Sequence, residues 1–301
     1  MKATRSFDVT YKDVDFEIIP SKLISLGGGS FWPPREESIR LKLSNYVPAM
    51  ILISSSIIYY FVLVPYVFPA MKPAPSEGSS AIKRCKTMRD MHNLLLCLYS
   101  GTCCFSTAYY LYYVRDGQLF DWEALLCEPV EGTWLRPLSM TFTLSKLVEW
   151  IDTAFIIWLG RSPPAFLHKY HHATTFWLFC FVPNLPGPEK FGLLLNGFVH
   201  FLMYSHYYKS WPKPIVPMIT VLQILQLSLV TYAWTVTPTV CPDSRFAKAA
   251  SDHPIEFMTP YGMVPVFLYL FILFFVKRFI LRKPKRQGNG EQTKNNEKKQ
   301  Q

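Results

Sequence analysis

Long apolar runs alternate with short polar stretches along most of this chain. Crossing the hydrocarbon core of a bilayer takes about 20 mostly apolar residues in a helix. Windows of that kind lie at 46–71, 92–114, 137–160, 165–182, 191–208, 214–237 and 261–281. The third, fourth and fifth windows contain ionisable residues, and we accept them because proline and charge clusters bracket each one. The pattern predicts seven transmembrane helices, with six or eight as the alternatives.

The composition agrees with a membrane protein. Of the 301 residues, 50% are hydrophobic and 17% are charged, whereas a soluble domain is about 25% charged. Seven spans would use roughly 140 residues, which leaves no room for a separate catalytic domain. We therefore predict an all-α integral membrane protein with three parts. These are a polar N-terminal segment at 1–45, a membrane domain at 46–281 and a disordered basic tail at 282–301.

Charged residues beside the spans predict the orientation of the chain. The net charge is +10, but the basic residues flank apolar windows, so we expect no nucleic acid partner. Lys and Arg gather on the cytosolic side of membrane proteins, which places 72–91 and 282–301 there. The mostly acidic loop at 115–136 suits the opposite face. An odd number of spans then gives an exterior N-terminus and a cytosolic C-terminus.

The C-terminus ends in Lys298-Lys299-Gln300-Gln301. Two lysines in these positions have the form of a dilysine signal, which returns membrane proteins to the endoplasmic reticulum. A chance match in a lysine-rich tail is the alternative. We expect a multi-pass protein of the endoplasmic reticulum membrane.

The cysteines predict one cross-link. There are seven cysteines and no Cys-x-x-Cys pair, so a zinc module or a disulfide framework is poorly supported. Only Cys127 and Cys241 lie on the predicted exterior face. If that face is the lumen of the reticulum, the compartment is oxidising and the two can pair. The alternative is that both stay free.

The third window carries three charges inside the expected membrane region. Lys146, Glu149 and Asp152 are spaced by three residues and so lie along one face of a helix. Ionisable groups are costly inside a membrane, and their presence is a functional hypothesis. The alternative is a self-neutralising charge ladder that holds helices together.

The fourth window begins after Pro163-Pro164, which favours a helix start. It then presents His168, His171 and His172 at positions i, i+3 and i+4, on one side of the helix. Imidazoles grouped in this way bind a metal ion or act as acid, base or nucleophile.

Two further polar stripes follow. Asn196, His200 and Tyr204 recur at intervals of four in the fifth window, and the sixth window contains Gln223 and Gln226. Hydrogen bonds between helices are the structural alternative for such seams. At a rise of about 1.5 Å per residue, Asp152, His171 and His200 can share one layer in the cytosolic half of the membrane.

These motifs resemble those of the ELO family of very-long-chain fatty acid elongases. They occur in the family's order: Lys146-x-x-Glu149-x-x-Asp152-Thr153, His168-x-x-His171-His172, Asn196-x-x-x-His200-x-x-Met203-Tyr204-x-x-Tyr207 and Thr220-x-x-Gln223-x-x-Gln226. One departure is that Ser205-His206-Tyr207-Tyr208 replaces the more usual Ser-Tyr-Tyr. The departure leaves open which tyrosine faces the site.

The resemblance implies a fold and a reaction. Six helices would form a closed ring around an acyl tunnel, with the seventh outside. The reaction would condense a long-chain acyl-CoA with malonyl-CoA to a 3-oxoacyl-CoA, releasing carbon dioxide and CoA, without a cofactor. The surroundings would be membrane lipid, and the partners a ketoacyl reductase, a dehydratase and an enoyl reductase. A homodimer is compatible with this class.

The resemblance and the chemistry together suggest roles for the residues. The catalytic set is Lys146, Glu149, Asp152, His168, His171, His172 and His200. The expected substrate contacts are Asn196, Tyr204, Tyr207, Gln223 and Gln226, with Lys169, Lys209, Lys277, Arg278 and Arg282 for the CoA phosphates. We expect His171 to form an acyl-imidazole, because neutral imidazole is a competent acyl acceptor. His200 would assist, and His168 and His172 would orient the cluster. Asp152 would orient an imidazole and stabilise its protonated form, as a carboxylate does in a catalytic triad. A structural zinc held by the same histidines is the competing account.

Two other classes of membrane protein are the alternatives. Di-iron desaturases and hydroxylases also contain His-x-x-His-His, but they need more clustered histidines than this chain offers among its seven. His92 stands alone in the sequence, and His253 lies on the predicted exterior side. A seven-span receptor or transporter would have no reason to concentrate lysine, carboxylates and histidines in one layer.

Overall fold

A computed structural model describes the chain at 53–72, 78–114, 122–128, 130, 133–160, 163–181, 189–242, 244, 246–248 and 254–281. The N-terminal segment 1–45 and the tail 282–301, with Arg282 and the dilysine pair, lie outside the described residues, as does His253. All regular secondary structure within the described ranges is helical.

Helices occupy each of the apolar windows. A helical run at Ile53–Ala70 includes η2 (Tyr59–Val67) and α3 (Phe68–Ala70). The others are α4 (Gly78–Val114), the short α5 (Trp122–Leu126), α6 (Leu135–Val148), α7 (Trp150–Trp158), α8 (Phe166–Phe181), α9 (Glu189–Tyr208), α10 (Val216–Val240) and α12 (Pro254–Phe275), which continues as η5 (Val276–Ile280).

Four of these helices are long and apolar enough to cross a membrane. They lie at Ile53–Ala70, Ser80–Tyr113, Val216–Val240 and Phe257–Ile280. The protein is therefore a helical integral membrane protein. In the remaining windows α6, α7 and α8 have 14, 9 and 16 residues, and α9 carries a polar stripe. A total of seven membrane-spanning helices stays a prediction.

Two boundaries differ from the sequence-based windows. The second window was expected at 92–114, with a loop before it, but α4 already begins at Gly78. Hydropathy marks only the apolar part of a helix, and the early turns of α4 are rich in charged residues, with Lys83, Arg84 and Lys86 exposed. The third window is divided into α6 and α7 by a turn at Glu149.

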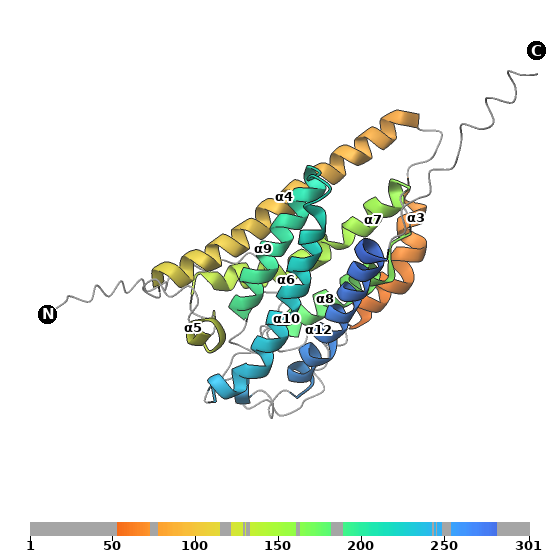
Figure 1. The fold of residues 1–301 in the computed structure, drawn as a ribbon. Coiled ribbons are helices and arrows are strands. Elements are labelled where there is room, and N and C mark those ends of the chain that lie inside the picture. Colours follow the sequence, from red (N-terminus) through yellow and green to blue (C-terminus); the bar gives the residue numbers. More distant parts are fainter. Residues whose placement is uncertain are drawn as a thin grey trace, which may run out of the picture. The chain divides into compact units, whose positions relative to one another are not determined.

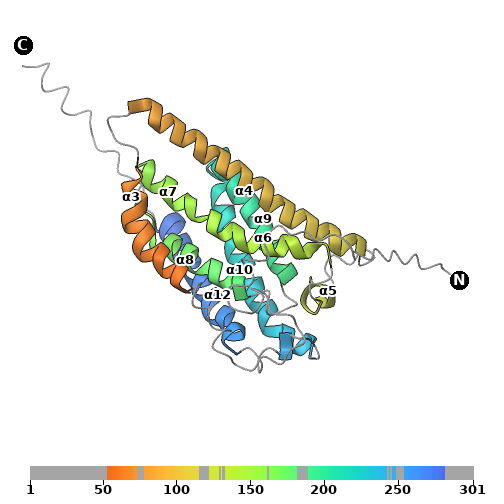
Figure 2. The same cartoon turned by 180° about the vertical axis from the view of Figure 1, so that it is seen from behind.

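The helices contact one another in an order that returns to its start. α4 contacts α9, and contacts continue from α9 to α10, α12, α8 and α6, which in turn contacts α4. Figure 1 shows α10 and α12 side by side, and Figure 2 shows α4 with α6 and α7 from behind. The run Ile53–Ala70 contacts α7 and α8 instead. These neighbours are those expected of a six-helix ring, and the ring itself stays a prediction.

The interface between α4 and α9 is unusually close. A Cβ atom built on Gly197 of α9 would lie 3.0 Å from the backbone nitrogen of Cys104 and 3.1 Å from the carbonyl oxygen of Ser100. Only glycine lets two backbones approach in this way. The polar stripe of α9, which flanks Gly197, is therefore held against α4.

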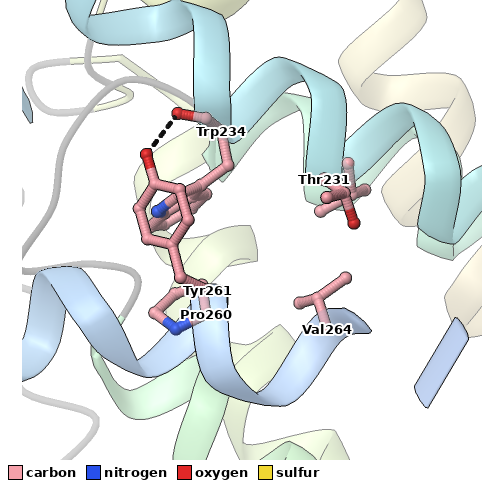
Figure 3. A pocket seen from close by; sticks show the side chains of 6 residues that line it. Thr231, Trp234, Pro260, Tyr261 and Val264 are labelled. Carbon is pink, nitrogen blue, oxygen red and sulfur yellow. Dashed lines mark hydrogen bonds between the residues drawn. The ribbon is translucent and has the colours of Figure 1, made fainter. Parts of the chain in front are cut away.

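α10 and α12 are tied by an aromatic pair. The Tyr261 hydroxyl of α12 donates to the carbonyl oxygen of Trp234 on α10, at 3.0 Å. Figure 3 shows both residues at a small pocket that Pro260, Thr231 and Val264 also line. The contact holds the two helices together at the half of α10 that leads to Cys241.

A disulfide joins two segments at one end of the helices. Cys127, directly after α5, is bonded to Cys241, directly after α10, with their Cα atoms 5.5 Å apart. Figure 1 shows α5 beside this end of α10. The start of α9 is held nearby, because Glu189 accepts a hydrogen bond from the backbone nitrogen of Val130 at 2.8 Å. The polar cluster described next lies nearer the opposite helix ends.

Candidate active site

Lys146 and Glu149 form a buried ion pair. The Lys146 Nζ donates to Glu149 Oε1 at 2.7 Å and to Asn196 Oδ1 at 3.2 Å. The two charged side chains are only 1% and 3% exposed. A buried charge is tolerated when it is paired and hydrogen-bonded, and the ammonium also lies 4.2 Å from the centre of the Phe142 ring. The pair joins α6 to α9 through Asn196.

Asp152 lies one helical turn further along and contacts two other helices. Its Oδ1 is 2.9 Å from His92 Nε2 of α4, and its Oδ2 accepts a hydrogen bond from the Tyr204 hydroxyl of α9 at 2.8 Å. The carboxylate therefore connects α4, α7 and α9. Sequence reasoning set His92 aside as solitary, although an ionisable residue in an apolar window was a signal that it has a partner.

His168 is held from the side of α7. Its Nε2 is 2.9 Å from Thr153 Oγ1, and the Tyr59 hydroxyl is 2.6 Å from the same oxygen. Tyr59 belongs to the first helical run, for which no site role was expected. The only signal in the sequence was a phenol in an apolar run, since a buried tyrosine usually finds a hydrogen-bond partner.

The three histidines of α8 face different neighbours. The His168 and His172 rings are 4.3 Å apart, and the His171 and His172 rings 5.6 Å apart. His171 lies against Phe267 of α12, with ring centres 5.3 Å apart. The Nδ1 of His172 is buried without a hydrogen-bond partner among the described residues. Of the three histidines of α8, His171 is therefore the one that points toward α12.

His200 completes the cluster from α9. Its Nδ1 is 3.5 Å from Glu149 Oε1, close enough for charge interaction, but has no hydrogen bond within the described ranges. His171 lies beside His172, whose backbone carbonyl oxygen accepts from Trp150, the residue after Glu149. The structure thus brings the charge ladder of α6, the histidines of α8 and the polar stripe of α9 together, in the shared layer expected from their depths.

The expected substrate-contact residues differ in how far they are buried. Tyr204 is fully buried and Tyr207 is 50% exposed, so Tyr204 is the tyrosine that faces the cluster. Gln223 Nε2 lies 3.7 Å from the Met203 sulfur, and Gln226 is buried on α10.

His206 lies outside the cluster. Its Nδ1 accepts a hydrogen bond from the backbone nitrogen of Trp211 at 2.9 Å. That bond stabilises the segment after α9. His206 therefore has a local role.

The basic candidates lie near helix ends. Lys209 directly follows α9, and Lys277 and Arg278 belong to η5; all three are exposed. The Lys169 Nζ lies 5.2 Å from the centre of the Tyr60 ring.

Candidate metal ligands and thiol groups also occur in the described part of the chain. Among the described residues, no three His, Cys, Asp or Glu side chains are arranged to hold a metal ion. The free cysteines in these ranges are all buried, namely Cys85, Cys97, Cys103, Cys104 and Cys180.

Comparison with known proteins places the chain in a family. The model of the GNS1/SUR4 family, ELO, matches residues 43–287. Very long chain fatty acid elongase 2 of Mus musculus is 28% identical over 87% of each chain. Fatty acid elongase 3 of Trypanosoma brucei brucei is 28% identical over 78% of this chain and 72% of that protein. Because the family model covers most of the sequence, the chain belongs to the ELO family.

Other relatives match over shorter segments. Long chain fatty acid elongase 1 of Caenorhabditis elegans is 35% identical over 47% of this chain and 50% of its own length. The chain spans about half to two thirds of the length of several curated relatives that it matches. No solved structure matches the chain. The family match gives no support to the desaturase and receptor alternatives.

Proposed function

We propose that this protein is a condensing enzyme of fatty acid elongation, a very-long-chain 3-oxoacyl-CoA synthase. It would join a long-chain acyl-CoA to malonyl-CoA and release a 3-oxoacyl-CoA, carbon dioxide and CoA. Membership of the ELO family and relatives named as fatty acid elongases support the substrate class. The observation that carries the site is the polar cluster in which the segment 149–153 contacts His200 of α9 through Glu149 and His168 of α8 through Thr153, beside the buried Lys146–Glu149 pair.

The proposed chemistry begins with His171 as nucleophile. The unprotonated nitrogen of its neutral imidazole attacks the thioester carbonyl, the carbon–sulfur bond breaks, and an acyl-imidazole forms. The proton on the other ring nitrogen is then lost, which leaves a neutral acyl-imidazole, and the departing CoA thiolate takes up one proton to leave as CoA–SH. His171 suits this step because His168 Nε2 is already engaged by Thr153. Splitting the reaction in this way divides one difficult step into two easier ones.

The second half-reaction makes the carbon–carbon bond. Loss of carbon dioxide from malonyl-CoA leaves a carbanion equivalent, which attacks the carbonyl carbon of the acyl-imidazole. The carbon–nitrogen bond breaks, and the leaving imidazole nitrogen takes up one proton to restore neutral His171. His200 would assist at the thioester or malonyl group, with Glu149 Oε1 3.5 Å from its Nδ1. The paired Lys146 keeps that carboxylate from being an isolated buried charge. A structural zinc held by the same histidines is the competing account.

The acyl chain and the CoA head need different surroundings. A chain of methylenes favours a dry apolar sleeve, and the cyclic order of helix contacts supports a tunnel between α4, α6, α8, α9, α10 and α12. The CoA phosphates would lie at the cytosolic mouth near Lys169, Lys209, Lys277, Arg278 and Arg282. The flanking charges support a cytosolic tail, and the Cys127–Cys241 disulfide supports an oxidising compartment, such as the lumen of the endoplasmic reticulum, at the opposite helix ends.

The product implies the enzymes that act next. A 3-oxoacyl-CoA becomes a longer saturated acyl-CoA only after reduction, loss of water and a second reduction. A ketoacyl reductase, a dehydratase and an enoyl reductase in the same membrane are therefore proposed partners.

A labelling experiment tests the acyl-imidazole. Wild-type protein incubated with labelled acyl-CoA and no malonyl-CoA should release CoA and retain label, and His171→Ala should do neither. His206→Asn is the matched histidine control and should label like wild type, because His206 Nδ1 accepts from the backbone nitrogen of Trp211 in the segment after α9. Undiminished labelling of His171→Ala would contradict the assignment. Condensation that proceeds only with a bound metal ion would favour the zinc account.

A further inference from the structure

Tyr59 reaches the histidine cluster from the first helical run. Its side chain is fully buried, although Phe61 and Tyr66 on the same helix are 63% and 71% exposed. The Tyr59 hydroxyl is 2.6 Å from Thr153 Oγ1, which is 2.9 Å from His168 Nε2. Three polar groups therefore form a continuous chain from the first helix through α7 to α8.

The burial of Tyr59 gives this chain a direction. Tyr59 and Thr153 each carry one hydroxyl proton, and within the described ranges Thr153 Oγ1 is the hydrogen-bond partner of the Tyr59 hydroxyl. If His168 donated to Thr153 and Thr153 to Tyr59, the phenol proton would be left buried without an acceptor, which is costly. If Tyr59 donates to Thr153, the Thr153 proton is directed to His168 Nε2. Both hydroxyl protons are then satisfied. If Tyr59 and His168 both donated to Thr153 Oγ1, the Thr153 proton would instead lack an acceptor among the described residues.

The direction of the chain fixes the proton on His168. In a neutral imidazole one nitrogen accepts and the other carries the proton. Because Nε2 accepts from Thr153, the proton of His168 lies on Nδ1. The ring that lies 4.3 Å from His172 is thus held in one tautomer, and its Nε2 is withdrawn from substrate chemistry.

A second contact from Tyr59 reaches α8 independently. The Tyr59 ring lies 4.6 Å from the Trp150 ring, and Trp150 Nε1 donates to the carbonyl oxygen of His172 at 2.7 Å. Tyr59 therefore supports the side chain of His168 through Thr153 and the backbone of His172 through Trp150. The histidine-bearing turn of α8 is held at two points from outside the cycle of contacting helices.

We propose that Tyr59 is a positioning residue for the histidine cluster, acting through Thr153 to keep His168 as the Nδ1–H tautomer. The first helix then contributes to the site and is more than a membrane anchor. The effect on turnover rests on the proposed condensing function, whereas the tautomer of His168 does not.

Tyr59→Phe isolates the hydroxyl group. The variant keeps the ring on Trp150, but Thr153 is then free either to donate to or to accept from His168. We expect kcat for condensation to fall about fivefold, the effect of about one hydrogen bond, with KM for acyl-CoA unchanged. Thr153→Val should have a similar effect, and the double variant should lose no more than the larger single loss, because both changes break one chain. Tyr66→Phe, on the exposed side of the same helix, is the matched control and should behave as wild type.

Solid-state NMR of protein labelled with ¹⁵N-histidine gives a readout that does not depend on turnover. The His168 signals are identified by their loss in His168→Asn. Wild type and Tyr66→Phe should show the Nδ1–H tautomer, and Tyr59→Phe a mixture of both. The proposal would be overturned if wild-type His168 carried its proton on Nε2, or if Tyr59→Phe left the tautomer or the turnover unchanged. Additive losses of turnover in the double variant of Tyr59→Phe and Thr153→Val would also overturn it. Wild-type protein with the expected tautomer but no condensation would instead contradict the proposed function.

Discussion

Both carboxylate oxygens of Asp152 are occupied, one by His92 and one by Tyr204. An ionised carboxylate in a membrane helix is costly unless such partners are present. The sequence predicted that Asp152 orients an imidazole near the box histidines. In the structure the imidazole that it contacts belongs to α4, and Asp152 reaches the rest of the cluster through Tyr204 of α9.

Replacing Asp152 by asparagine should separate its charge from its shape. The amide has nearly the same volume, and its oxygen can still accept from Tyr204, so Asp152→Asn should fold. Loss of the charge facing His92 should lower kcat for condensation by about 100-fold, within the range expected for a group that supports acid–base chemistry. Turnover is measured together with the melting temperature.

The control for this variant lies on α4. Asp90→Asn removes a carboxylate that pairs with its neighbour Arg89 and is 39% exposed. It should leave turnover unchanged. Normal turnover of a well-expressed Asp152→Asn would assign Asp152 to structure alone.

The spacing of residues predicted only part of this network. The ion pair between Lys146 and Glu149 follows from their separation of three residues on one helix. The contacts of Asp152 with His92 and of Tyr59 with Thr153 join residues 60 and 94 positions apart. No local pattern indicates such contacts, because they depend on which helices become neighbours and at what depth.

At the scale of elements, apolar windows located the helices well and their limits less well. Each window became helical, since backbone groups in an apolar environment must be satisfied within the segment. The early turns of α4 and the turn at Glu149 were missed because hydropathy averages over the few residues that define a boundary. The close approach of α4 and α9 was also missed, although Gly197 lies within the polar stripe of α9.

Gly197 offers a test of that interface. A methyl group in Gly197→Ala would meet backbone atoms of Cys104 and Ser100 at 3.0 and 3.1 Å, and backbone atoms cannot move aside as a side chain can. Overpacking of this kind costs about 1–3 kcal/mol, which exceeds the gain in helix propensity of up to about 1 kcal/mol. We therefore expect a lower melting temperature and lower turnover, since Asn196 and Tyr204 lie on the displaced helix.

Gly262→Ala is the matched control for the helix-propensity effect. Gly262 lies in α12, and a Cβ atom there would have no neighbour within 4 Å. Its melting temperature should stay equal or rise slightly. Equal melting temperatures for wild type and Gly197→Ala would show that the two helices can separate without cost.

For the whole molecule, the order of helix contacts could not be obtained from hydropathy. The cycle from α4 through α9, α10, α12, α8 and α6 departs from chain order, and periodicity within a window says nothing about which window lies beside it. A ring of helices was expected only because the motifs resemble those of the ELO family. By contrast, the two ends of the helices could be distinguished from flanking charge, and that distinction singled out one cysteine pair.

The disulfide between Cys127 and Cys241 tests stability and orientation together. It spans 114 residues. In the chain-entropy account, closing so long a loop stabilises a chain by about 4–5 kcal/mol. This is an upper value here, because membrane insertion already restricts the unfolded chain. The double change Cys127→Ser with Cys241→Ser should lower the melting temperature by several degrees. Cys85→Ala is the control, and it should have a smaller effect because Cys85 is a free cysteine of α4 and its loss opens no loop.

In mass spectrometry of protein alkylated without reduction, Cys127 and Cys241 should remain unmodified. Their full alkylation would place this end of the helices on a reducing side, against both the cross-link and the proposed lumenal position.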